Sequence, residues 1–433
     1  MDMITYLKDI IDLSPFAKSG AVSGVRYNPL KVTRERFLDL FEGEVQPARY
    51  FEGGYKLIGE KEGLGNSPLH MAGGCYFQEP SAMSAITAMN VQNGDRVLDL
   101  CAAPGSKATA LAALNPDGIT VANEIHPARA KILASNMERL GIYRALIARS
   151  DAAGLANNFA GYFDKILLDA PCSGEGMFRK YPEILTDWTE QLVEMCACRS
   201  RELLEHAAGM LRPGGRLVYS TCTFNLEENE KNILDFLSLH PEFEVVESGV
   251  SGAEKGLLGL EKAVRIFPDD NGEGHFVCAL QKSEDAPAGY SDPQYFKADK
   301  PNEPLLALLE SLADMSVFGD FVLHTAGQNV YLIPADMPQP KGVQILRAGV
   351  QAALLKGKTY VPCHHLYTAA PTNAIRQSIA VDNAGADRFF RGETLPCNTK
   401  GFTAVMWQGL CIGFGKAVDG TLKNYFPKGL RKI

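Results

Sequence analysis

Between residues 96 and 239, short apolar runs alternate with segments in which apolar residues recur at helical spacing. The runs contain almost no polar residues, which is typical of parallel strands buried on both faces of a sheet. Strands are expected at 96–100, 119–122, 145–148, 163–168 and 216–220, and helices at 108–114, 126–140, 188–211 and 227–239. This alternation predicts a doubly wound α/β domain.

Further domains are expected on either side, because 433 residues exceed the usual size of one domain. Up to residue 68, glycine-broken segments surround a short amphipathic piece at 34–41. After residue 282, a stretch rich in Ala, Pro and Gly is typical of a linker, and the chain then turns to short β-rich segments and a basic end. We expect an N-terminal domain at 1–68, the α/β domain at 69–282, a linker at 283–295 and a C-terminal β-rich region at 296–433.

The composition is that of a globular protein, with 46% hydrophobic and 22% charged residues. This excludes a largely disordered chain. The formal net charge of −8 gives no sign of nucleic-acid binding in the average, although a local basic surface is compatible with it.

The start of the chain has no basic segment followed by an apolar run, and no stretch is apolar enough to span a bilayer. Ten cysteines without dense paired spacing favour reduced thiols and a cytoplasmic protein with no membrane partner. Cys196 and Cys198 point to different faces of a helix, so no metal site is expected.

An acidic residue stands at or just beyond the end of each of four successive predicted strands: Asp99, Glu124, Asp151 and Asp169. Single acids there commonly cap helices, but ligands of such sheets also bind at the carboxyl ends of the strands. The loop after the first strand is built from small residues and has neither G-x-G-x-x-G nor a P-loop. A cofactor with adenosine and no phosphate, such as S-adenosylmethionine, fits this loop, although the fold alone leaves the ligand open.

Two cysteine-bearing turns follow the fourth and fifth strands, at Asp169-Ala170-Pro171-Cys172 and Ser220-Thr221-Cys222-Thr223. If these strands are neighbours, both thiols reach one cleft, because adjacent strands lie about 5 Å apart. Lys107, or the N-terminus of a helix beginning near Asn225, would supply the positive setting that a nucleophilic thiol needs. The alternatives are two small buried side chains or a disulfide.

A thiol beside a methyl donor suits the methylation of cytosine at carbon 5, which is too weakly nucleophilic to react directly. Thiolate addition at carbon 6 activates carbon 5, and a carboxyl such as that of Asp169 would favour the addition at ring nitrogen 3. A base must later remove the proton from carbon 5, a step that a second cysteine would assist.

Four segments carry a resemblance to a known family: YFQEPSAM at 76–83, DLCAAPGSK at 99–107, DAPCSGEGMFRK at 169–180 and YSTCTFNLEENE at 219–230. With these motifs in this order, the chain resembles the Sun/Nop family of RNA (cytosine-5) methyltransferases. Weaker similarity extends to 26–33 and 272–276. The resemblance implies a Rossmann-like, S-adenosylmethionine-dependent methyltransferase domain whose N-terminal neighbour positions RNA.

The resemblance also implies roles for individual residues. Cys222 would be the nucleophile, Cys172 would assist release, Lys107 would orient the site, and Asp169 would face the target base as well as the cofactor. Ser106 stands where the family more often has Gly, which is tolerable if the backbone angle there does not require Gly. S-adenosylmethionine contacts are expected from Cys101, Ala102, Ala103, Pro104, Gly105, Ser106, Lys107, Glu124, Asp151 and Asp169.

The C-terminal end is similar to the PUA-like domain of the RsmF branch, whose members modify 16S ribosomal RNA. Its basic residues alternate with aromatic ones, which favours RNA contact over a merely solubilising tail. RNA contacts are expected from Arg179, Lys180, Lys416, Lys423, Lys428 and Arg431, although the first two are equally typical of a solvated helix start. The expected partner is 16S ribosomal RNA or the small ribosomal subunit, bound by a monomer. The same chemistry on transfer RNA or another ribosomal site, or a non-catalytic RNA-binding assembly factor, remain the alternatives.

Overall fold

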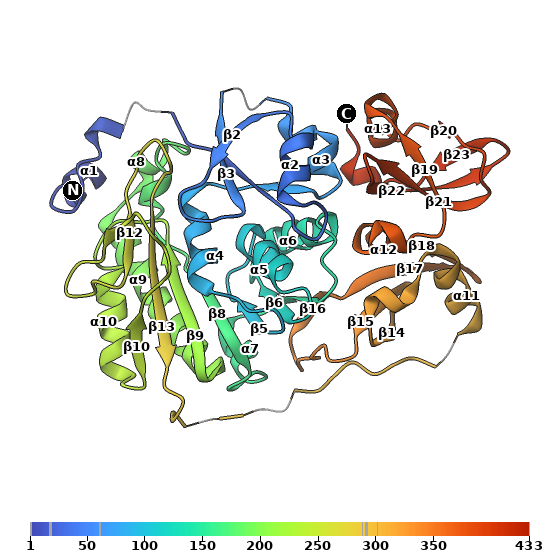
Figure 1. Ribbon diagram of the computed structural model, residues 1–433. Helices are drawn as coiled ribbons and strands as arrows, with labels where there is room; N and C mark the ends of the chain where they lie inside the picture. The colour runs from blue at the N-terminus through green and yellow to red at the C-terminus, as the bar shows by residue number, and fades with distance from the viewer. Residues whose placement is uncertain are drawn as a thin grey trace.

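A computed structural model describes residues 2–16, 20–59, 62–287, 289–290, 293–300 and 302–432 (Figure 1). Its largest sheet runs in the order β11-β12-β13-β9-β8-β5-β6-β7-β16, with β10 paired to β13. The central strands are all parallel, as the apolar runs predict. They are β5 (Arg96–Asp99), β6 (Ile119–Asn123), β7 (Ala145–Arg149), β8 (Phe163–Asp169) and β9 (Leu211–Thr221).

Helices cover both faces of this sheet, so the Rossmann-like α/β fold is confirmed (Figure 1). One face packs against α7 (Ala152–Ala156), α9 (Glu190–Met210) and α10 (Glu230–Leu239). The other face packs against α4 (Ser84–Met89), α5 (Ser106–Leu114) and α6 (Pro127–Arg139). Because the parallel strands are buried on both sides, their polar ends are left at the carboxyl edge, where the site lies.

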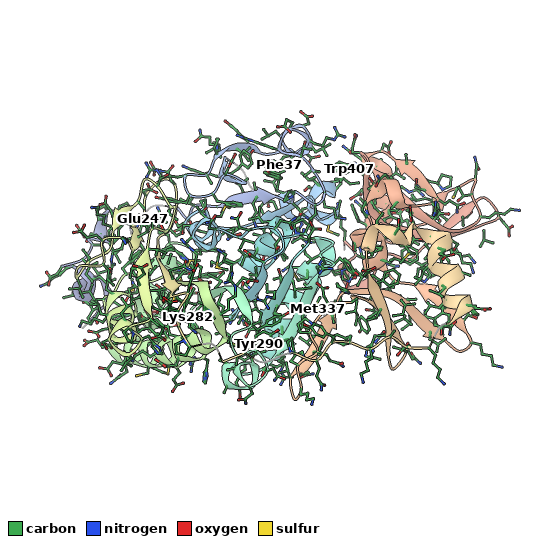
Figure 2. The ribbon with its side chains drawn as sticks, turned by 60° about the horizontal axis from the view of Figure 1, so that its bottom comes forward. Phe37, Glu247, Lys282, Tyr290, Met337 and Trp407 are labelled. Atoms are coloured by element: carbon green, nitrogen blue, oxygen red, sulfur yellow. The ribbon has the colours of Figure 1, made fainter. Side chains whose placement is uncertain are left out.

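Antiparallel strands extend the sheet at both edges, which the apolar pattern does not predict. Beyond β9 lie β13 (His275–Lys282), β12 (Val264–Ile266), β11 (Glu254–Lys255) and β10 (Phe243–Val246). Beside β7 lies β16 (Gln344–Ala348), a strand from the C-terminal region that pairs Gln344 with Arg149. Met337, also from that region, is buried in the core of the same sheet (Figure 2).

The N-terminal residues form a four-stranded antiparallel sheet in the order β2-β3-β1-β4, which follows helix α1 (Met3–Leu7). The strands are β1 (Gly24–Tyr27), β2 (Glu44–Pro47), β3 (Gly54–Ile58) and β4 (Cys75–Phe77), and β4 lies beyond residue 68. Helix α2 (Arg34–Leu40) occupies the amphipathic piece at 34–41, and α3 (Pro68–Met71) precedes β4. Phe37 of α2 shares a hydrophobic cluster with Trp407 of the C-terminal region, so these two parts pack together (Figure 2).

The C-terminal region is β-rich, as expected. One sheet contains β14 (Phe321–Ala326), β15 (Asn329–Pro334), β17 (Val350–Lys356) and β18 (Thr359–Pro362). The other contains β19 (Ser378–Val381), β20 (Leu395–Pro396), β21 (Gly401–Trp407), β22 (Leu410–Val418) and β23 (Thr421–Asn424). The helices are α11 (Glu303–Leu312), α12 (His364–Ala369) and α13 (Asn383–Phe390). Of the predicted linker, residues 288, 291 and 292 lie outside the described residues.

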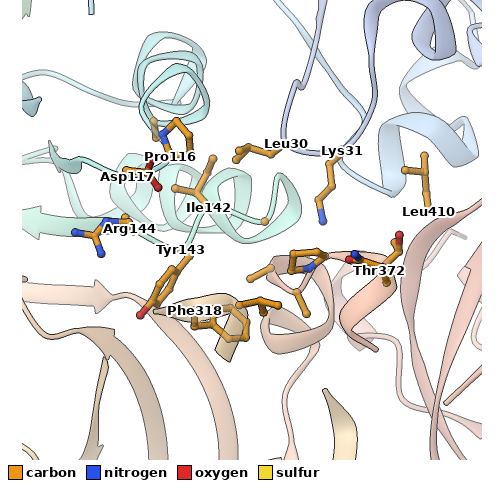
Figure 3. A pocket seen from close by; sticks show the side chains of 17 residues that line it. Leu30, Lys31, Pro116, Asp117, Ile142, Tyr143, Arg144, Phe318, Thr372 and Leu410 are labelled. Carbon is orange, nitrogen blue, oxygen red and sulfur yellow. The ribbon is translucent and has the colours of Figure 1, made fainter. Parts of the chain in front are cut away.

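A cavity of about 370 Å³ lies where the N-terminal, α/β and C-terminal parts meet (Figure 3). Its lining includes Lys31, Tyr143, Phe318 and Thr372. The cysteine turns and the strand-end acids do not line it, so it is separate from the predicted site. Across the described ranges, no helix has the length and apolar character needed to cross a membrane.

Candidate active site

The two cysteine turns lie side by side, because β8 and β9 are neighbouring parallel strands with Asp169 level with Ser220. The Sγ atoms of Cys172 and Cys222 are 3.3 Å apart, and both cysteines are free thiols. The prediction that both thiols reach one place is therefore confirmed. The hydrogen bond to Cys222, together with burial, raises the pKa of the Cys172 thiol well above its usual value. The Cys172 thiol therefore keeps its proton at neutral pH, and either sulfur can donate in the contact.

Asp169 connects the cysteine turns to the loop after β5. Its Oδ2 accepts a hydrogen bond from Lys107 Nζ at 2.7 Å, and its Oδ1 accepts one from Ser220 Oγ at 2.8 Å. Burial alone would raise the pKa of Asp169, but Lys107 and the neighbouring groups outweigh it and the pKa is lowered. Burial opposes the charge of Lys107 as well, yet Asp169 holds the pKa of that ammonium above its usual value. The pair is therefore ionised.

His275 is a site residue that the sequence motifs do not identify. It begins β13, which lies beside β9, and its Nε2 is 3.6 Å from Asp169 Oδ1. The signal in the sequence is the segment 272–276, which has only weak family similarity. Because β13 is far from β8 along the chain, the contact depends on sheet order.

The small residues of the loop after β5 pack closely against the protein. Gly105 precedes α5 with φ of 107°, and a Cβ there would lie 3.1 Å from Leu133 Cδ1. Ser106 is the first residue of α5 and is not among the residues with positive φ, so Gly is not required at this position. Ala102 and Ala103 are buried, Cys101 is half-buried, and Pro104 is exposed after a cis peptide bond.

The strand-end acids have different surroundings. Asp99 is buried, and burial together with the charge of Asp169 raises its pKa to about 7; Oδ1 of Asp99 has no hydrogen-bond partner among the described residues. Glu124 is also buried, accepts a hydrogen bond from His126 N at 2.8 Å and lies 3.4 Å from Arg129 Nη1. Asp151 is exposed and caps α7 by accepting from Gly154 N at 2.7 Å. A buried acid after β6 and a close backbone approach after β5 fit a ribose-bearing ligand without phosphate.

A buried polar network fixes the two cysteine turns against each other. Glu175 accepts hydrogen bonds from Phe224 N at 2.7 Å and Asn225 N at 2.9 Å, and Glu228 accepts from Ser173 N at 2.9 Å. The expected helix N-terminus near Asn225 is wrong, because α10 begins at Glu230 and the turn before it is held by these side chains instead. Lys107, whose charge interacts with Cys222, is the candidate positive group that remains.

The residues expected to contact RNA fall into two groups. Arg179 has a side chain only 2% exposed, and its Nε lies 2.7 Å from Glu273 Oε2. This corrects the expectation for Arg179, because a buried guanidinium with a carboxylate partner has no surface to offer a phosphate. Lys180 and Lys428 are exposed, and Arg431 is half-buried against the backbone of Phe426.

Lys416 and Lys423 form the clearest exposed basic feature. Both are exposed, and they are direct register partners on β22 and β23. Lys416 Nζ also lies 5.4 Å from the centre of the Phe402 ring. Like charges directly opposite each other destabilise a sheet, so this pair favours an anionic partner.

Comparison with known proteins connects this site to a family. A family model described as 16S rRNA methyltransferase RsmB/F matches residues 86–281, and one described as the methyltransferase RsmF PUA domain matches residues 376–432. A ribosomal RNA small subunit methyltransferase F from Vibrio vulnificus is 32% identical over 441 residues, which are 97% of this chain and 93% of that protein. The protein of the same name from an Enterobacter species is 32% identical over 435 residues, covering 94% and 89%.

Solved structures share the fold. A methyltransferase homolog protein from Pyrococcus horikoshii is 28% identical with a TM-score of 0.55, covering 62% of this chain and 89% of that chain. NSun6 from Pyrococcus horikoshii, solved with SFG, has a TM-score of 0.59 over 66% of this chain and 98% of that chain; at 21% identity it shows the fold alone. The implied dependence on S-adenosylmethionine and the PUA-like end are thus confirmed. The chain belongs to the RsmB/F family of S-adenosylmethionine-dependent ribosomal RNA methyltransferases.

Proposed function

We propose that this chain methylates carbon 5 of a cytosine in 16S ribosomal RNA, acting as a monomer through a covalent bond between Cys222 and the base. The observation that carries the proposal is the 3.3 Å contact between the Cys172 and Cys222 sulfurs, beside the ion pair of Lys107 and the partly exposed Asp169. Binding RNA alone would need neither thiol.

The contact supports a division of labour between the thiols. The family resemblance assigns the attack to Cys222, and the raised pKa of Cys172, which keeps that thiol protonated beside it, is consistent with Cys172 not being the attacking group. Cys222 adds to carbon 6, and the electron pair of the 5,6 double bond makes carbon 5 nucleophilic. S-adenosylmethionine supplies the electrophilic methyl group at this point.

Asp169 and Lys107 prepare the site for that addition. Lys107 keeps Asp169 ionised, so this carboxylate can take the proton that the Cys222 thiol releases and pass it to ring nitrogen 3. Protonation there makes carbon 6 a better electrophile, and the carboxylate then accepts a hydrogen bond from the protonated nitrogen. After transfer, the proton on carbon 5 must leave to a base while the carbon 6–sulfur bond breaks and its electrons return to Cys222. Cys172, in contact with that sulfur, assists this release.

The cofactor would be held by the loop after β5 and by the ends of the following strands. Gly105 and the buried alanines allow the backbone to approach it, and the buried Glu124 is placed for a ribose hydroxyl. The proposed set is Cys101, Ala102, Ala103, Pro104, Gly105, Ser106, Lys107, Glu124, Asp151 and Asp169.

The relatives' names support 16S ribosomal RNA, and the PUA match supports an RNA-binding C-terminal end. Contacts to phosphate are proposed for Lys416 and Lys423, with Lys180, Lys428 and Arg431 as further candidates. Residues 1–68 would help to position the RNA, and 296–433 would form the RNA-binding region.

Replacing the nucleophile tests the chemistry. Cys222→Ala should abolish methyl transfer while RNA binding persists, because the mutation removes the attacking sulfur and no basic surface. Cys198→Ala, an exposed cysteine on α9, is the matched control and should keep full activity. Undiminished transfer by Cys222→Ala would refute the covalent mechanism.

Replacing the second thiol tests release. Cys172→Ala should accumulate a covalent protein–RNA adduct, seen as a slower band in denaturing electrophoresis that disappears on RNase treatment. An active variant that forms no adduct would contradict the role of Cys172.

The substrate is tested in cells. Bisulfite sequencing of total RNA from a deletion strain should lose a 5-methylcytosine signal in 16S ribosomal RNA. Loss in transfer RNA or at another ribosomal site would redirect the proposal to that RNA, and no loss anywhere would favour a non-catalytic assembly factor.

A further inference from the structure

His275 has an unusual environment for a buried histidine. Its side chain is 2% exposed, and neither ring nitrogen has a hydrogen-bond partner among the described residues. Leaving a buried polar group unpaired destabilises a fold, so such a group calls for an explanation. A charged atom, Asp169 Oδ1, lies 3.6 Å from its Nε2.

The backbone holds His275 rigidly at this place. The neighbouring Gly274 donates its N–H to Ser81 Oγ at 3.1 Å, and Phe276 pairs with Thr221 across β13 and β9. His275 therefore stands one position beyond that pair, level with Cys222, the proposed nucleophile. Gly274 has φ of 127°, and a Cβ there would lie 2.5 Å from the Phe224 ring, so this approach leaves little freedom.

The groups around the ring keep it neutral. Burial and then the charge of Lys107 lower the pKa of His275 to about 3, although Asp169 and the neighbouring Gly274 backbone oppose the change. The charged groups that face it are Lys107 from α5 and Asp169 from β8. The titratable Asp99, at the end of the neighbouring strand β5, interacts with both of these groups. A neutral imidazole has one N–H to donate, and the carboxylate of Asp169 is its natural acceptor.

We propose that His275 is a positioning residue for the methyl transfer: its Nε2–H closes onto Asp169 Oδ1 when the base binds and holds that carboxylate toward ring nitrogen 3. The inference rests on the proposed function and adds a residue to it. A separation of 3.6 Å is too long for a hydrogen bond, but hydrogen bonds of catalytic groups are often long before substrate binds and shorten in the complex. Ser220 Oγ on β9 already donates a hydrogen bond to Asp169 Oδ1. A second hydrogen bond from His275 on β13 would restrain the same carboxylate from another direction.

The test compares His275→Phe with His275→Gln in steady-state methylation of 16S ribosomal RNA. Phe keeps a buried ring without nitrogen, whereas the Gln amide nitrogen reaches about as far as Nε2. We expect kcat of His275→Phe to fall about tenfold to hundredfold, the factor expected for a lost hydrogen bond to a charged group. The KM for RNA and the KM for S-adenosylmethionine should each stay within about twofold of the wild-type value. His275→Gln should regain most of kcat.

Stability separates positioning from a structural role. Because His275→Phe removes unpaired buried nitrogens, its thermal midpoint should equal or exceed that of the wild type. His364→Phe is the matched control: it removes another buried histidine whose Nδ1 lacks a partner among the described residues, and it lies in the C-terminal region. It should leave kcat unchanged.

An unchanged kcat in His275→Phe would overturn the inference, as would a His275→Gln variant no better than Phe or a loss explained by a lower thermal midpoint. If His275→Phe fails to fold, the inference is overturned when the folded His275→Gln variant loses as much kcat as a Cys222→Ala enzyme. Failure of the wild type to form 5-methylcytosine would instead refute the proposed function, so the two failures are distinguishable.

Discussion

Removing the charge of Lys107 should destabilise the protein in a pH-dependent way. Lys107 Nζ lies 2.7 Å from Asp169 Oδ2, and the side chains are 7% and 30% exposed. At an effective dielectric constant of about 20, this separation corresponds to roughly 6 kcal/mol of gross attraction. Much of this offsets the desolvation of both ions, and breaking a buried pair typically costs about 3–5 kcal/mol. Since Asp169 keeps some contact with solvent, we expect Lys107→Met to lower the free energy of unfolding by about 3 kcal/mol near neutral pH.

The sign of the pH dependence follows from Asp169. In the wild type its folded-state pKa is lowered, so its ionised form stabilises the fold above the usual carboxyl pKa, and that contribution is lost only as the pH falls through the lowered value. In Lys107→Met, burial and the nearby Asp99 raise the pKa of Asp169 instead, and mild acid neutralises the unpaired charge. The difference in unfolding free energy between wild type and variant should therefore shrink between about pH 8 and pH 5.

Urea unfolding followed by tryptophan fluorescence at several pH values measures this difference. Lys131→Met, which removes an exposed lysine on α6, is the control and should change stability by no more than about 0.5 kcal/mol at any pH. Equal stabilities of Lys107→Met and wild type near pH 7, or a difference that grows on acidification, would refute the argument.

Three further predictions concern other parts of the molecule. Gly105→Ala should destabilise by at least about 1 kcal/mol and weaken S-adenosylmethionine binding in calorimetry, because φ is 107° and Leu133 lies against the new Cβ, whereas Ser106→Gly should leave that affinity nearly unchanged. Lys423→Ala should weaken RNA binding and reduce the slope of log K against log salt concentration by about one unit, without loss of stability. Arg179→Ala should instead lower the free energy of unfolding by about 3–5 kcal/mol, because it leaves the Glu273 carboxylate buried without its cationic partner. Equal stability of these two variants would contradict the assignment of Arg179 to the interior. Without cofactor, stability should rise as the pH falls from about 8 to 6, because the folded pKa of Asp99, about 7, lies above its unfolded value, and Asp99→Asn should reduce that rise in thermal unfolding.

Much of the α/β domain can be predicted from the sequence because its signals are local. The apolar runs at 96–100 and 163–168 became β5 and β8, and Gly105 in the small-residue loop between β5 and α5 adopts a positive φ, which glycine favours. The edge strands were not predictable in the same way. For β16, about two hundred residues separate it from its partner β7, and nothing in its local pattern specifies that partner.

The sequence by itself determined the strand and helix periodicity, the two cysteine turns and the acids at the strand ends, because each depends on neighbours a few residues away. Only the tertiary structure decided which of these groups meet. Sheet order placed Cys172 against Cys222, and it placed His275 of β13 next to Asp169 of β8 although they lie 106 residues apart. Burial likewise decided that Arg179 pairs with Glu273 while its neighbour Lys180 faces solvent. Nothing in the local sequence distinguishes an interior guanidinium from an exposed ammonium at these two adjacent positions.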